Sequence, residues 1–296
     1  MVANKRSQSL CYNLVRSIRI TGCELPITII HFGGDAIDSE YLLKECKCLN
    51  HSMLPASGLG LVEKLSEVLK DCPKGFLYRF IGWYLDWDQF IYSDNDIVAI
   101  SNWTDLFDKL EENDDLLHAD LEYTTKGIYN YKVPQKVKEI FSESVFDKEV
   151  TAGHFLVNIK QKHIDHLINT INWFKKNPDI PKFHDQALLN ICIHLHDWKT
   201  INLCQGPYMY LSSWHGDYKN SFDFASKVAM AQGRITHIHY SGYTPVGLFP
   251  MEELLKIDAT VNERIKSHTI VGLKFFSGFY YISSLIKKVK RKLKNI

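Results

Sequence analysis

Two aspartates separated by a single residue are the part of the sequence best suited to chemistry. Asp94 and Asp96 follow Gln89–Ser93, a short apolar segment whose pattern predicts a strand. Two carboxylates on a turn leaving one strand project into the same small volume, where their hard oxygen atoms suit Mn²⁺ or Mg²⁺. Such an ion would neutralise a diphosphate and help it depart as a leaving group. The alternative is a polar turn that caps the next helix, because acidic turns are common.

Strands and helices are predicted to alternate on both sides of this turn. Apolar spacing predicts helices within residues 10–20, 61–69, 103–111, 162–175 and 184–195, and strands at 27–32, 89–93, 154–159 and 235–240. This alternation indicates an α/β domain with a mostly parallel sheet. Ligands of such sheets bind beyond the carboxyl ends of the strands, and the two aspartates follow such an end.

The composition is that of an ordinary globular chain. Its 296 residues, 45% hydrophobic and 23% charged, are enough for one catalytic domain with an appendage. A formal net charge of +1 argues against nucleic acid as a partner. The seven cysteines lack the spacing of a zinc site or a disulfide framework, which favours reduced thiols and a cytoplasmic location. The polar, basic start predicts no signal peptide, and no apolar run is long enough to span a membrane.

The segment around the acidic pair resembles the DxD segment of GT-A glycosyltransferases, in which an apolar strand delivers the acids and another apolar run follows. Four further segments resemble this family in the same order: 14–27 its approach to the second strand, 152–158 its Asn-Ala-Gly segment, 184–190 its Asp-Gln-Asn helix start, and 239–245 the His-x-x-Gly-x-x-Lys-Pro-Trp ending of the retaining family 8 branch. The resemblance spans residues 10–250. It implies the GT-A fold, a Rossmann-like, mostly parallel mixed sheet flanked by helices.

The resemblance also implies a set of metal ligands. Asp96 would ligate the metal directly, Asp94 would contact the metal, a water or the ribose of a nucleotide, and His239 would be the third protein ligand. An imidazole suits Mn²⁺ better than Mg²⁺. His237 shares a strand face with His239, so either could be the ligand. Gly242, at the family's spacing, favours His239 and is itself implied in binding the nucleotide.

Three further residues are implied in contacts with the sugars. Asp185 would bind hydroxyl groups of the donor sugar, and Gln186 would lie under the anomeric carbon, where a developing oxocarbenium ion favours a nearby carbonyl dipole. Asp185 could equally be a helix cap. Asp120 stands where related enzymes place an acid that contacts the sugar or the acceptor, although an exposed loop carboxylate is an equal alternative.

The sequence departs from the family's pattern at three places. Only residues 1–3 are left for the first strand, Thr151 stands where the family has Asn, and Thr244 replaces the Lys that meets the diphosphate. We therefore expect the neutralisation of the diphosphate to be shared by the metal, Arg79 or Lys5. The missing Lys also leaves inversion open beside retention of the anomeric configuration.

Residues 251–296 are predicted to form a helical tail on a catalytic domain of residues 1–250. Residues 270–286 are rich in Phe, Tyr, Ile and Leu, and six of the 35 Lys and Arg residues lie between Lys287 and Lys294. An apolar face beside a polybasic stretch is typical of a helix lying on an anionic membrane surface. The alternative is a helix packed on the core with a solvated end. The membrane interpretation predicts a peripheral protein on the inner face of the membrane.

These features predict a metal-dependent glycosyltransferase of polysaccharide biosynthesis. It would move a hexose from a nucleotide-diphosphate sugar, such as a UDP-sugar, to a glycan or lipid-linked glycan acceptor, with retention favoured by His239, Gly242 and the pair Asp185 and Gln186. Two other classes stay open. A sugar nucleotidyltransferase should show a Gly-rich basic loop near its start, which is not visible. A non-catalytic glycan- or membrane-binding protein of the same fold would bind no UDP with Mn²⁺.

Overall fold

The computed structural model describes residues 1–120, 131–142, 145–146, 149–181 and 184–214, together with 217, 218, 223, 226, 227, 230 and 234–239. Gly242, Thr244 and the tail of residues 251–296 lie outside the described residues. Within the described residues, no helix combines the length and apolar character needed to cross a bilayer.

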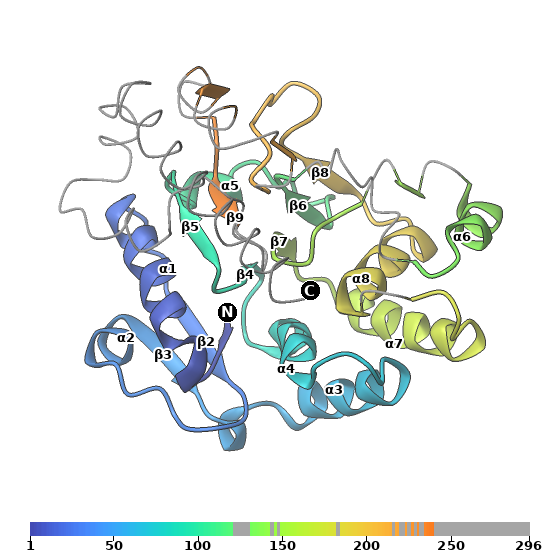
Figure 1. The fold of residues 1–296 in the computed structure, drawn as a ribbon, viewed down its shortest axis with the longest axis horizontal. Helices are drawn as coiled ribbons and strands as arrows, with labels where there is room; N and C mark the ends of the chain where they lie inside the picture. The colour runs from blue at the N-terminus through green and yellow to red at the C-terminus, as the bar shows by residue number, and fades with distance from the viewer. Residues whose placement is uncertain are drawn as a thin grey trace, which may run out of the picture.

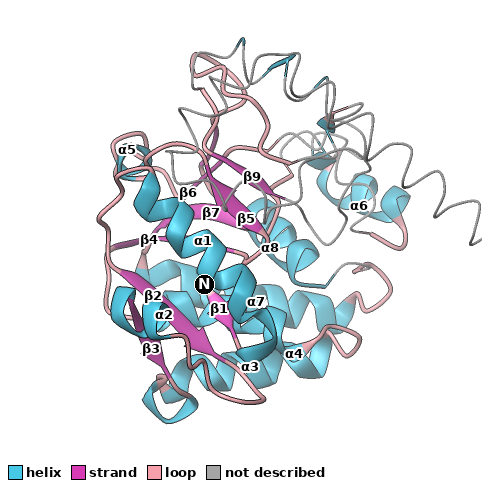
Figure 2. Cartoon of the chain, turned by 60° about the vertical axis from the view of Figure 1, so that its left-hand side comes forward, coloured by secondary structure: helices cyan, strands magenta, loops and turns pink. Residues whose placement is uncertain are grey.

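A small parallel sheet opens the fold. Its strands, in the order β1-β2-β3, are β1 (Val2–Ala3), β2 (Ile27–His31) and β3 (Cys46–Leu49). The helices α1 (Gln8–Ile20) and α2 (Glu40–Glu45) bury apolar side chains against it, and Figure 2 shows the three strands side by side with these helices near them. The expected first strand is present but has only two residues.

The central sheet is mixed. Its four strands, in the order β4-β7-β6-β8, are β4 (Gln89–Ser93), β7 (His154–Asn158), β6 (Leu116–His118) and β8 (Thr200–Asn202). Strand β7 runs antiparallel to both of its neighbours, whereas β6 and β8 are parallel. A separate antiparallel pair joins β5 (Ile97–Ala99) to β9 (His237–His239), and Figure 1 shows this pair beside the central strands.

Alternate residues of the central strands enter two apolar clusters on opposite faces of the sheet. Leu116 and Val157 pack with α3 (Ala56–Val68), α7 (Gln161–Lys176) and α8 (His184–Leu195), whereas Leu117 and Leu156 pack with α1, β5 and α5 (Thr104–Phe107). Because side chains alternate along a strand, this division puts apolar layers on both faces, as in an α/β protein. The remaining described helices are α4 (Lys74–Leu77), α6 (Pro134–Phe141) and three 3-10 helices at Lys5–Ser7, His51–Met53 and Tyr78–Tyr84.

The predicted helices and strands are confirmed, most of them within one or two residues. The helix expected within 61–69 begins five residues earlier, at Ala56, and the helix expected at 103–111 ends at Phe107. The next residues form a turn in which the Leu110 amide donates to the Phe107 carbonyl at 3.3 Å and the Leu110 side chain is buried. The apolar spacing extends to Leu110 because this side chain is buried, although its backbone lies in a turn and not in the α-helix.

Candidate active site

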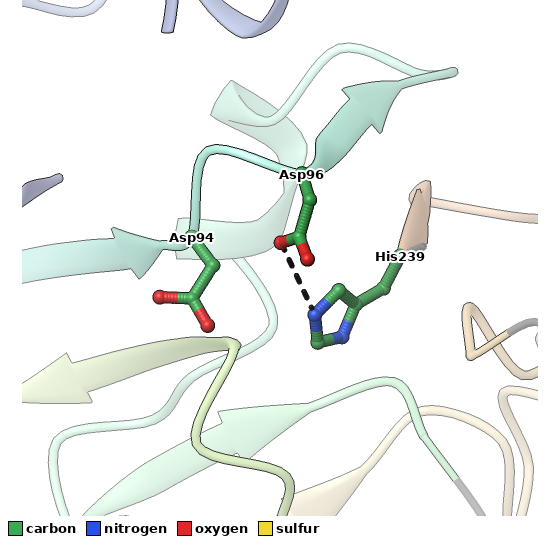
Figure 3. A group of neighbouring side chains, drawn as sticks. All are labelled: Asp94, Asp96 and His239. Atoms are coloured by element: carbon green, nitrogen blue, oxygen red, sulfur yellow. Dashed lines mark ion pairs between the residues drawn. The ribbon is translucent and has the colours of Figure 1, made fainter. Parts of the chain in front are cut away.

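The three proposed metal ligands lie together at one edge of the central sheet. Asp94 follows β4 directly, Asp96 precedes β5, and His239 ends β9. His239 pairs with Ile97 in the ladder between β5 and β9, so this ladder brings the imidazole next to the acidic turn. One ligand atom from each of the three side chains lies within 4.8 Å of the other two, and His239 Nε2 is 3.5 Å from Asp96 Oδ1 (Figure 3).

This geometry fits a divalent cation. At metal–oxygen distances of roughly 2.1 Å, two ligand atoms should be about 3 Å apart when adjacent and about 4 Å apart when opposite. The ligand atoms of the three side chains therefore need to move only slightly closer together to bind one ion. Two carboxylates and an imidazole form a donor set that suits Mn²⁺. The Asp94 and Asp96 side chains are 29% and 28% exposed, which leaves room for water or phosphate oxygens to complete the coordination.

The charges of the cluster also favour a cation. Burial alone would lower the pKa of His239, but its hydrogen bond to Asp96 and the charges of Asp96, Asp94 and Asp120 raise that pKa to about 9. Burial raises the pKa of Asp94, against the opposing effect of the Arg79 guanidinium. A divalent cation would displace the proton from His239 and supply the positive charge that these acids favour.

Arg79 connects the candidate metal ligands to the predicted sugar site. Its side chain is only 4% exposed, and its Nη2 and Nε lie 3.3 Å from Asp94 Oδ1 and 3.0 Å from Asp185 Oδ2. The Phe76 carbonyl accepts a further hydrogen bond from Nε at 3.0 Å, and the guanidinium lies 4.7 Å from the ring centre of Tyr92. Arg79 therefore fixes both acids relative to each other, besides being the predicted donor-binding residue.

A three-residue turn before β7 contacts the predicted site residues. The Thr151 hydroxyl donates to Asp120 Oδ2, and the Ala152 carbonyl accepts from Arg79 Nη1. The Ala152 amide donates to Gln186 Oε1 at 3.4 Å. The Gly153 carbonyl accepts from the Asp94 amide at 2.7 Å. The turn thus contacts Asp94, Arg79, Gln186 and Asp120, and it holds these predicted site residues close to one another.

Asp120 is buried, so the alternative of an exposed loop carboxylate is wrong. Its two carboxylate oxygens accept hydrogen bonds from the hydroxyl groups of Ser213 and Thr151. Thr151, which replaces the family's Asn, thereby has a structural partner in this chain. A buried carboxylate that accepts hydroxyl hydrogen bonds is held in one orientation, which is useful for a group that contacts a sugar.

Lys5 is not brought to the cluster through any contact that the structure shows. It pairs with Asp38, and the two side chains are 41% and 67% exposed. His237 contacts other residues: its ring lies 3.9 Å from the ring of His154, and its Nδ1 is 2.7 Å from Thr236 Oγ1. Of the two histidines on β9, His239 is the one beside the acids.

Sequence reasoning missed Tyr92 and Ser213. The Tyr92 hydroxyl donates to Asp94 Oδ1 at 2.6 Å, and it could have been suspected because residues two apart on a strand share a face. Ser213 reaches Asp120 from a distant loop, and its sequence neighbourhood carries no signal for that contact.

Two solved glycosyltransferases share this fold. The bifunctional glycosyltransferase WbbM, in its apo form, has a TM-score of 0.53 and 14% identity over 90% of this chain and 50% of its own chain. The galactosyltransferase LgtC, in complex with donor and acceptor sugar analogs, has a TM-score of 0.53 and 13% identity over 90% of this chain and 95% of its own. This chain thus spans about half of WbbM. No protein-family model and no curated protein sequence matches the chain.

The chain therefore has the GT-A fold, a mixed α/β sheet flanked by helices, which the sequence resemblance implied.

Proposed function

We propose that the protein is a metal-dependent glycosyltransferase that takes a hexose from a nucleotide-diphosphate sugar, preferably a UDP-sugar. The observation that carries the proposal is the meeting of Asp94, Asp96 and His239 within 4.8 Å at the edge of a GT-A sheet. These three side chains would hold Mn²⁺ or Mg²⁺, and the bound ion would neutralise the departing diphosphate. The structures of LgtC and WbbM support the fold on which this assignment rests.

The other side chains of the site would bind and orient the donor. Asp185 is 8% exposed as a residue, and its ion pair with Arg79 aims one carboxylate oxygen while the other can accept from a sugar hydroxyl. The Gln186 carbonyl oxygen accepts a hydrogen bond from the Ala152 amide, which would hold the side chain under the anomeric carbon. Asp120, fixed by two hydroxyl groups, would contact the donor sugar or the acceptor hydroxyl. Arg79 would share the neutralisation of the diphosphate.

The acceptor in this proposal is a hydroxyl group of a glycan or lipid-linked glycan, as in polysaccharide biosynthesis, and LgtC offers a precedent for a bound acceptor analog on this fold. Retention of the anomeric configuration is the outcome favoured by Asp185 and Gln186. The apolar and basic residues of 270–294 would hold the enzyme on the anionic inner face of the membrane. Deletion of residues 270–296 should release the protein from membrane fractions, and unchanged partitioning would contradict this part of the proposal.

Titration calorimetry with UDP, with and without Mn²⁺, tests the proposal directly. UDP should bind in the presence of Mn²⁺, and Asp96→Asn should abolish that binding. The control Asp108→Asn, at the exposed residue that follows α5, should not change it. A screen of nucleotide-sugars for metal-dependent release of UDP should then identify the donor. Absence of metal-dependent UDP binding by the unmodified protein would overturn the assignment in favour of a non-catalytic binding protein.

A further inference from the structure

Gly153 lies with its α-carbon directly against the imidazole of His239. A Cβ atom at this position would be 2.2 Å from His239 Cε1, 2.8 Å from Nε2 and 2.9 Å from Nδ1. Real Cβ atoms essentially never approach other heavy atoms within 3.0 Å. Gly153 is not among the glycines with positive φ, so the need for a glycine here comes from space and not from backbone conformation.

The imidazole has little freedom to move away from a new methyl group. His239 is 5% exposed, its strand is fixed by the pairing of His239 with Ile97, and its amide donates to the Ser213 carbonyl at 3.0 Å. Gly153 also contacts the acidic turn, because its carbonyl accepts a hydrogen bond from the Asp94 amide at 2.7 Å. Gly153 thus touches two of the three proposed metal ligands at once. A shift of either the ring or the turn would change the distance between those ligands.

We propose that Gly153 is a positioning residue of the metal site, whose missing side chain lets the His239 imidazole lie against the turn before β7 with Nε2 facing Asp96. This inference rests on the proposed function, because positioning matters only if the three side chains hold a cation. The methyl group of an alanine would push the ring off Asp96 or push the Gly153 carbonyl off the Asp94 amide. Either shift spoils a ligand geometry that tolerates errors of only a few tenths of an ångström.

The substitution Gly153→Ala tests the inference, with Gly60→Ala as the matched control. A Cβ at Gly60, an exposed position of α3, would meet no atom within 4 Å, and alanine favours a helix. Gly60→Ala should therefore leave Mn²⁺ affinity unchanged. Gly153→Ala should weaken Mn²⁺ binding about 10- to 100-fold, as expected when the support of a metal ligand is lost. It should also lower the melting temperature by on the order of 5 °C through overpacking.

A second pair of variants separates contact with the ring from a general backbone defect. His239→Ala removes the imidazole, so adding Gly153→Ala to His239→Ala should cost almost no further melting temperature. An equal cost of Gly153→Ala in both backgrounds would overturn the inference, and so would wild-type Mn²⁺ affinity in Gly153→Ala. The melting temperatures of the metal-free proteins decide the steric contact. If the unmodified protein itself binds neither Mn²⁺ nor UDP, the proposed function fails while that steric result still stands.

Discussion

At the scale of single residues, the buried cation Arg79 is the group on which most of the site depends. Its one planar guanidinium pairs with Asp94 and Asp185 and donates to the Ala152 carbonyl. The compact ammonium group of a lysine cannot make these three contacts at once. We expect Arg79→Lys to lower the rate of the proposed sugar transfer by about 10-fold or more. Arg79→Met should also destabilise the fold by about 3 kcal/mol, because it leaves the buried carboxylate of Asp185 without its partner. Chemical denaturation and transfer kinetics measure both effects, and Arg6→Lys, at an exposed position, is the control.

The sequence predicted the members of this site better than the contacts between them. The spacing of Asp94 and Asp96 after an apolar strand predicts them as metal ligands, and the place of His239 before Gly242 predicts it as the third. The structure brings these three side chains together. The ion pair between Arg79 and Asp185 could not be predicted, because the chain folds back through several elements between them. Lys5 pairs with Asp38 in the structure, and its contact with the diphosphate stays a prediction.

At the scale of elements, a buried acid joins β6, β8 and the start of α7. Asp115 accepts from His163 Nε2 at 2.9 Å, from Lys160 Nζ at 3.0 Å and from the Lys199 amide at 2.9 Å. The Lys160 amide approaches His163 Nδ1 at 3.4 Å, so the imidazole also caps the helix as a neutral ring. Burial would raise the pKa of Asp115, but these hydrogen bonds hold it well below its usual range.

Asp115→Asn should therefore destabilise the protein by about 3 kcal/mol at pH 7, whereas Asp165→Asn, at an exposed position of α7, should change stability by less than about 0.5 kcal/mol. The Asp115 carboxylate is bound more strongly in the folded state, so its contribution exists above about pH 4 and is lost as the pH falls below that value. Urea denaturation at pH 7 and pH 3 distinguishes the two variants. Equal midpoints for Asp115→Asn and the unmodified protein at pH 7 would contradict this role.

Five helices and four strands were predicted from the sequence, whereas α2, α4, α6, β3, β5, β6 and β8 were not. The strands β5, β6 and β8 have three residues each, too few for a periodic pattern to appear. Their pairing partners come from distant segments, as in the ladder between β5 and β9. The mixture of parallel and antiparallel ladders is likewise a property of the assembled sheet, which no single segment encodes.

At the scale of the whole molecule, buried neutral histidines should control acid stability. Burial lowers the pKa of His118 and of His163 to about 4 and that of His154 to about 3, and it lowers the pKa of His237 well below its usual value. The unfolded chain binds protons on these rings from about pH 6.5 downward, while the folded chain does not. As the pH falls from 6.5 to 4, the free energy of unfolding should therefore decrease by up to about 1.4 kcal/mol per pH unit for each ring.

The pKa of His239 is shifted in the opposite direction, so its effect on stability has the opposite dependence on pH. Because its folded pKa is raised to about 9, its contribution is complete below about pH 6.5 and is lost as the pH rises through 9. The melting temperature of the metal-free protein should thus have its maximum near pH 6.5, and Mn²⁺ should flatten the alkaline side by displacing the proton. Calorimetric scans from pH 5 to 9.5, with and without Mn²⁺, measure both limbs. An alkaline limb that Mn²⁺ leaves unchanged would contradict the role of His239.

The arrangement of acids around Arg79 would set the order in which a cation and a nucleotide bind at the proposed site. Among the residues that the structure describes, the carboxylates of Asp94, Asp96, Asp120 and Asp185 lie together with the cationic side chains of Arg79 and protonated His239, a formal excess of two negative charges. A free nucleoside diphosphate would be repelled by this excess, whereas the cation is attracted. Occupancy would then follow the supply of free divalent ions in the cell more closely than the supply of nucleotide.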